Sequence, residues 1–118
     1  MNLQERCDAI EEAYEFMLAY AAQGVGNDAG QIRQFLTKAS GALTGITAED
    51  ISQSFTVVLQ RDAESAKAAI ELVLDQPAIS SQLIDNLNAS IHLRAVLTDF
   101  FLLDEILKLR QKTSAERT

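Results

Sequence analysis

The sequence predicts an all-α protein, a four-helix bundle-like single domain whose third and fourth helices form a long antiparallel hairpin and which assembles as a dimer. Three observations lead to this prediction. Alanine, leucine, glutamine and glutamate are abundant, which favours helix over strand. Apolar residues recur at helical spacing along the chain of 118 residues, which is long enough to bury a core without a metal or a disulfide. Only five glycines and one proline interrupt the pattern.

The first helix is expected over residues 2–23. Leu3, Ile10 and Met17 repeat every seven residues, and further apolar residues beside them widen the apolar face. Gly24 follows directly and is a natural left-handed stop. The first helix should therefore pack one broad face against the rest of the domain.

The second helix is expected to be short. Asp28 can cap its start, with Gln31 three residues later as in a capping box. Apolar residues then follow at helical spacing from Ile32. Gly41 and Gly45 should end it.

The third helix, expected over residues 48–75, has a well-marked start. Thr47 would be the N-cap and Asp50 the third helical residue, whose carboxylate can reach back to the cap. Ile46 and Ile51 flank these positions and would form a hydrophobic staple. Together they predict a helix that begins directly after the cap.

The fourth helix is expected over residues 78–112. Pro77 disfavours helical geometry in the residue before it and can itself be the first helical residue, although Ser80 or Ser81 could be the cap instead. The region 1–112 then forms the single helical domain. A flexible polar tail should follow at 113–118.

The fourth helix carries more apolar surface than one helix face can hold. Two stripes together nearly encircle it between residues 95 and 109, and a helix that is apolar all round is buried all round. We therefore expect it to form the interface of a two-fold homodimer or to bind another protein. The alternative is a monomer in which the first two helices cover it. The expected interface residues are Leu93, Val96, Leu97, Phe100, Phe101, Leu103 and Leu107.

Polar residues interrupt these stripes. Arg94 stands where an aliphatic residue would be expected, and Asp99 is likewise a charged residue within this apolar stretch. We expect both to be buried or interface residues, with His92 as a further interface candidate. The alternative for Arg94 is an aliphatic stem on apolar surface with its charged group in water.

The charge of the chain, −7 from 17 acidic and 10 basic residues, argues against binding nucleic acid, which requires clustered lysine and arginine. Acidic residues crowd the first helix. Glu11, Glu12 and Glu15 are expected either to form a patch that attracts a basic protein partner or simply to be a solvated helix face.

The sequence offers little for catalysis or metal binding. There is one histidine and one cysteine, with no ligand pair at metal-site spacing and no phosphate-binding glycine motif. We expect no cofactor, no metal and no catalytic residue, so that an enzyme is the least favoured of the functions considered. A lone cysteine, no signal peptide and no membrane-spanning run indicate a cytoplasmic protein.

The alternative to an interaction protein is a small-molecule binder. Such a protein would have a pocket between the long helices, lined by aromatic side chains that include Tyr14, Tyr20 and Phe55. Aromatic residues at helical spacing are far more often core residues, so the interaction protein is the preferred hypothesis.

Overall fold

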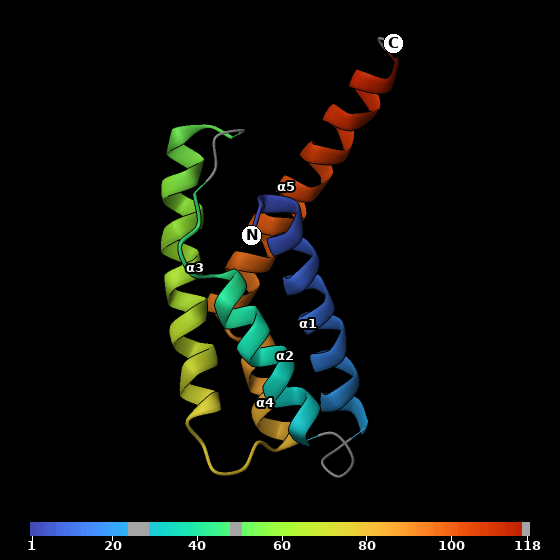
Figure 1. The fold of residues 1–118 in the computed structure, drawn as a ribbon. Coiled ribbons are helices and arrows are strands. Elements are labelled where there is room, and N and C mark those ends of the chain that lie inside the picture. Colours follow the sequence, from blue (N-terminus) through green and yellow to red (C-terminus); the bar gives the residue numbers. More distant parts are fainter. Residues whose placement is uncertain (24–28, 48–50, 117–118) are drawn as a thin grey trace.

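The computed structural model describes residues 1–23, 29–47 and 51–116, and this part of the chain consists of helices and connecting segments, with no strand (Figure 1). The prediction of an all-helical single domain is confirmed, although five helices are described where we expected four. Their bounds are α1 Leu3–Gln23, α2 Ala29–Ala42, α3 Gln53–Leu74, α4 Ser81–Ala89 and α5 Ile91–Glu116.

The first two helices lie close to their predicted positions. The expected stop at Gly24 and cap at Asp28 fall outside the described residues. Helix α2 ends at Ala42, and Gly45 adopts a left-handed conformation with φ of 64°, which glycine reaches without steric cost. Gly45 thus turns the chain after α2, as its position in the sequence suggested.

The predicted start of the third helix is wrong. Helix α3 begins at Gln53, and its N-cap is Ser52, whose hydroxyl accepts a hydrogen bond from the Phe55 amide at 3.3 Å. Thr47 is exposed and is not a cap of α3, and the predicted partner Asp50 lies outside the described residues. Ile46 is instead a core residue.

Hydrogen bonds from elsewhere in the fold hold the backbone that follows α2, up to Ile46. The buried guanidinium of Arg6 donates to the carbonyls of Ala42 at 2.9 Å, Thr44 at 2.7 Å and Gly45 at 3.3 Å. The Gln60 amide donates to the Ile46 carbonyl at 2.7 Å. These long-range bonds satisfy the backbone of the segment after α2 in a non-helical conformation, which local sequence signals cannot show.

The single fourth helix expected over residues 78–112 is in fact two helices. Ser80 caps α4 by accepting from the Leu83 amide at 3.0 Å, so Pro77 precedes the helix. Ser90 is extended, with ψ of 143°, and ends α4. Its hydroxyl accepts from the Leu93 amide at 3.3 Å at the start of α5. Helix α5 then continues to Glu116, past the predicted end at residue 112.

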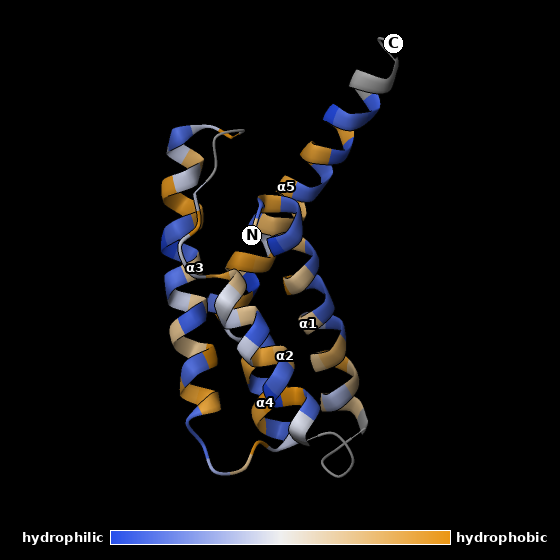
Figure 2. Cartoon of the chain, viewed as in Figure 1, coloured by the Kyte–Doolittle hydropathy of each residue, from blue (hydrophilic) through white to orange (hydrophobic). Residues whose placement is uncertain are grey.

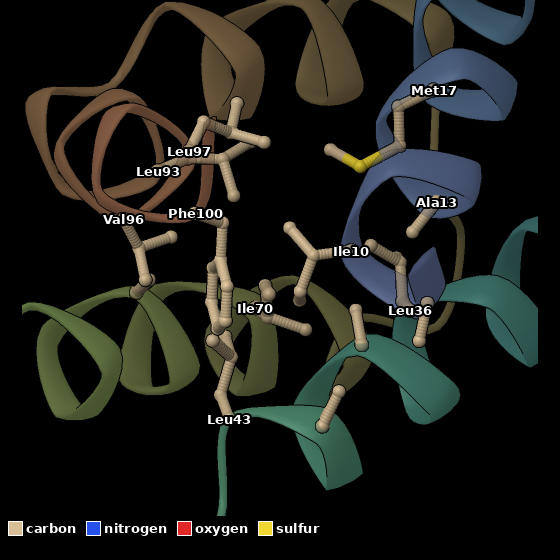
Figure 3. Close-up of a cluster of buried hydrophobic side chains, with 14 of the residues drawn as sticks. Ile10, Ala13, Met17, Leu36, Leu43, Ile70, Leu93, Val96, Leu97 and Phe100 are labelled. Atoms are coloured by element: carbon tan, nitrogen blue, oxygen red, sulfur yellow. The ribbon is translucent and has the colours of Figure 1, made fainter. Parts of the chain in front are cut away.

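The core lies where α1, α2, α3 and α5 meet. Helix α1 packs against α2 and α4 and less extensively against α5, whereas α3 packs mainly against α5 (Figure 1). Phe100 is fully buried and extends from α5 toward Leu43, with Ile10 of α1 nearby (Figure 3). One helix face of α5 is therefore used inside the chain's own core.

The C-terminal half of α5 extends beyond the other helices (Figure 1). The molecule measures 51 × 26 × 21 Å, and its radius of gyration is 15.3 Å. A compact domain of this length would have a radius of about 13.5 Å. The projecting end of α5 is the visible reason for the elongation, and it places part of the predicted apolar helix away from the core.

Candidate interaction surface

The structure buries most of the predicted interface residues inside one chain. Five of them have at most 4 % of their surface exposed and belong to the core: Leu93, Val96, Leu97, Phe100 and Leu103. These five side chains pack against the chain's own helices, so the surface of α5 that remains for a partner lies elsewhere on the helix. Leu107 is half-buried, and Phe101 is 46 % exposed.

The apolar surface that remains uncovered on α5 is a second stripe, formed by Leu102, Ile106 and Leu109. Their exposed fractions are 53 %, 40 % and 54 %. Spacings of four and three residues place the three side chains on one side of the helix, as in the contact seam of a coiled coil. Figure 2 shows apolar bands continuing into the projecting end of α5. We call these three residues the α5 stripe.

A groove between α3 and α5 borders the α5 stripe on one side. It has a volume of about 310 Å³, and its apolar lining includes Phe55 from the first turn of α3, Ile51 just before that helix, and Leu102 and Ile106. Ser52 and Arg110 add polar groups at its edge. The stripe therefore continues into a hollow surface instead of standing alone, which is typical of a surface that receives a partner.

A second groove, between α1 and α5, lies beside Phe101 and has a volume of about 340 Å³. Its apolar residues are Leu18, Phe101 and Tyr14, of which the first two are each 46 % exposed. Glu11 and Glu15 of the predicted acidic patch are also among its lining residues. The fold thus joins two features that are 86 or more residues apart in the sequence. We call this surface the α1–α5 groove.

An ion pair forms part of the α1–α5 groove. Lys108 donates to Asp104 at 2.9 Å, and the Gln4 amide donates to the same carboxylate at 3.1 Å. These two hydrogen bonds lower the pKa of Asp104, and the same ion pair raises the pKa of Lys108. Burial, followed by the charge of Asp104, raises the pKa of Glu11. The carboxylates of the groove are therefore crowded, and Lys108 balances only part of their charge.

The third member of the predicted acidic patch faces elsewhere. Glu12 pairs with Lys38 of α2 at 3.5 Å, and both side chains are more than half exposed. Glu12 is not among the residues that line the α1–α5 groove. The patch is therefore divided between a groove and an ordinary surface ion pair, which contributes little to stability.

Two of the three predicted polar interface residues, Asp99 and Arg94, lie at a separate hollow, and His92 is not among its lining residues. Asp99 is 7 % exposed, whereas Arg94 and His92 are exposed. Asp99 and Arg94 line one hollow of about 510 Å³, which Asp62 of α3 also lines. No hydrogen bond or ion pair joins Asp99 to Arg94 among the described contacts. Burial, and then the neighbouring Asp62 carboxyl, raise the pKa of Asp99 to about 7.

The aromatic residues of the small-molecule hypothesis do not share a pocket. Tyr20 is buried, and its hydroxyl donates to the Ile79 carbonyl at 2.6 Å, which ties α1 to the loop before α4. Tyr14 lines the α1–α5 groove, and Phe55 lines the groove between α3 and α5. In the described part of the chain these three aromatic side chains therefore lie at three separate places.

The one cysteine of the chain lies in the core. Cys7 is fully buried, and burial followed by the nearby Asp104 raises the pKa of its thiol to about 12, so the thiolate is strongly disfavoured. Among residues 1–23, 29–47 and 51–116 there is no group of three or more histidine, cysteine, aspartate or glutamate side chains that could hold a metal ion.

Several residues that form the candidate interaction surface were not predicted from the sequence. The α5 stripe was seen only as part of the apolar surroundings of the fourth helix, and Leu18 and Asp62 were not singled out. The spacing from Leu102 to Leu109 was a usable signal, because it repeats the pattern of the buried residues on another side of the helix. Only the packing shows that the apolar stripe from Leu93 to Leu103 faces the core and that the α5 stripe does not.

Comparisons with protein-family models, with curated proteins and with solved structures find no match to this chain. None of the helices in the described ranges has the length and hydropathy needed to cross a membrane.

Proposed function

We propose that the protein is a non-catalytic helical interaction protein that acts as a homodimer and serves as an adaptor, assembly factor or regulator of a larger protein. The observation that carries the proposal is the α5 stripe. Three large apolar side chains, each at least 40 % exposed, lie on a helix end that projects from the domain and border a groove of about 310 Å³. Burying such a surface against a partner is favourable by about 25 cal/mol for each Å² of apolar area.

A two-fold dimer fits the shape of this surface. The projecting end of α5 can lie against the same end of a second copy, because a two-fold axis brings identical patches together. The stripe would then meet its equivalent, and the groove beside it would receive the flanking side chains. The core is complete within one chain, so each protomer is expected to be folded before it pairs.

Substitution within the α5 stripe tests the proposal. We expect the wild-type chain to be a dimer at about 20 µM and Leu109→Lys to weaken dimerisation by about tenfold or more, because each dimer would bury two added charges. Leu72→Lys is the matched control, since Leu72 is an α3 residue with 65 % exposure and lies outside the stripe and its groove. Native mass spectrometry and sedimentation equilibrium report the stoichiometry. A wild-type monomer at this concentration would contradict the homodimer.

We also propose that the protein acts in the cytoplasm. The support is its cysteine content: the chain has one cysteine, which cannot form an intrachain disulfide and which is fully buried. Localisation of a tagged chain by cell fractionation tests this proposal, and recovery from an oxidising compartment would contradict it.

Binding of a small molecule is the second candidate function. The groove between α3 and α5 is its support, because it is mainly apolar and lined by Phe55, one of the aromatic residues that the hypothesis named. The same native mass spectrum separates the two functions. A reproducible added mass that Phe55→Ala removes would favour a ligand, whereas a dimer without added mass favours the interaction protein.

A further inference from the structure

Acidic side chains gather on α1, and basic side chains gather at the end of α5. Helix α1 carries five acidic residues against one arginine, and that arginine, Arg6, is buried and bonded to backbone carbonyls. The end of α5 carries Lys108, Arg110 and Lys112 within five residues, with the exposed Leu109 between them. One chain therefore presents an acidic groove with apolar residues and, on the projecting helix end, a basic segment with an apolar residue.

We propose that the α1–α5 groove of one copy binds the basic end of α5, residues 107–112, from a second copy. The inference rests on the proposed homodimer and names the segments that meet in it. The groove offers the exposed apolar side chains of Leu18 and Phe101, beside the carboxylates of Glu11 and Glu15. The helix end offers basic side chains that complement these carboxylates, among them the exposed Lys112.

The register of an antiparallel α5 pair supports this assignment. The stripe residues Ile106 and Leu109 are three residues apart, so a two-fold pair can place Ile106 of each copy against Leu109 of the other. That register sets residues 107–114 of one helix opposite residues 101–108 of its partner. The α1–α5 groove lies along residues 101–108 of α5. The pairing that interleaves the apolar stripes thus brings the basic segment level with the groove.

Charge complementarity along the helices points the same way. In this register Glu105 of one copy and Lys112 of the other lie beside the contact between the two α5 stripes. They lie on the side of α5 that carries Phe101, and α1 is on the same side. Glu15 of the groove is exposed and unpaired by any described ion pair, and Glu11 is crowded by Asp104. An ammonium group from a second copy would relieve this repulsion. Because the relation is reciprocal, both grooves of the dimer are filled and the assembly closes.

Two complementary charge-reversal variants test the inference. Glu11→Lys with Glu15→Lys reverses the groove, and Lys112→Glu reverses the helix end. Each variant alone places like charges together at both contacts of the homodimer, so we expect each to dimerise about tenfold or more weakly than wild type. A mixture of the two variants places opposite charges together at both contacts, and we expect heterodimers to recover most of the wild-type affinity.

The control carries the same charge change at another place. Glu64→Lys with Asp85→Lys alters two exposed residues on α3 and α4 that do not line the α1–α5 groove, and should leave dimerisation near wild type. Circular dichroism checks that each variant is folded, and Glu15→Lys alone serves if the double reversal is not. We expect the defect of each variant to shrink in about 0.5 M salt, which screens exposed charges.

The outcomes separate this inference from the function on which it rests. If wild type is a dimer but the charge reversals dimerise as well as wild type, or the mixture forms no heterodimer, the pairing of groove and helix end is wrong and the homodimer stands. If wild type is a monomer, both proposals fail. Weak homodimers with a restored heterodimer support both.

Discussion

At the scale of single residues, Asp99 is the least favourably placed charge in the described structure. It is 7 % exposed, one of its carboxyl oxygens has no hydrogen-bond partner, and it lies near Asp62. Burial and this neighbour raise its pKa to about 7, whereas an aspartate in an unfolded chain has a pKa of about 3.9. The folded state therefore binds more protons than the unfolded state between these two values.

The free energy of unfolding should consequently fall as pH rises from about 4 to 7 and level off above that range. Asp99→Asn removes the ionisation while keeping the shape of the side chain. We expect this variant to be more stable than wild type by roughly 2 kcal/mol at pH 8, with the difference shrinking toward pH 4. Urea unfolding of both chains across this range measures it. A variant less stable than wild type at pH 8 would show that the Asp99 carboxylate is stabilising.

Asp62→Asn is the matched control for this prediction. It removes the neighbouring carboxyl but leaves Asp99 buried, so it should relieve only part of the effect. An equal gain from both variants would mean that repulsion between the two carboxyls, more than burial, determines the pKa of Asp99.

At the scale of helices, the position of a cap distinguishes the sequence-based prediction from the structure. Ser52→Ala removes the hydroxyl that accepts from the Phe55 amide, and we expect it to lower the free energy of unfolding by about 1 kcal/mol. Thr47→Ala should change it by less than about 0.5 kcal/mol, because Thr47 is exposed and does not cap α3. Thermal and urea unfolding measure both. A larger loss for Thr47→Ala would restore the earlier helix start.

The sequence predicted helix boundaries correctly where a boundary depends on residues that are close by in the chain. The caps and stops at Ser80 and Pro77 are visible in the sequence, and the structure confirms that the third helix ends just before Pro77. The break at Ser90 is not visible, because the apolar repeat continues through it and serine is only a moderately poor helix former. The start of α3 was misplaced for a different reason, since the sequence holds two hydroxyl residues that could cap it, Thr47 and Ser52, and the structure uses Ser52.

The candidate interaction surface could likewise be predicted only in part from the sequence. The sequence predicted that the last helix has more apolar surface than its own domain needs, and the exposed α5 stripe agrees with that expectation. It also showed two stripes on this helix, one from Leu93 to Leu107 and one formed by Leu83, Leu87, Leu97 and Phe101, with Leu102, Ile106 and Leu109 only among the residues around them. Which stripe faces the core depends on the packing of α3 and α1, and the acidic groove depends on α1 lying beside residue 101. Neither arrangement is encoded in local spacing.

At the scale of the whole molecule, a complete core and an uncovered helix end predict how stability depends on concentration. Each chain buries its own core, so a monomer should be folded, and dimerisation would add stability by mass action. Raising the protein concentration about a hundredfold above the dissociation constant should then raise Tm by up to about 5 °C for a chain of this size. Differential scanning calorimetry over this range measures the shift.

Leu109→Lys provides the comparison, because it alters an exposed residue and should leave the folded monomer intact. Its Tm should depend much less on concentration than the wild-type Tm and should match the wild-type value at high dilution. If the variant instead melts well below dilute wild type, Leu109 contributes to the monomer's own stability. If wild type shows no dependence on concentration, the homodimer is contradicted, because mass action requires a dimer to gain stability as the protein concentration rises.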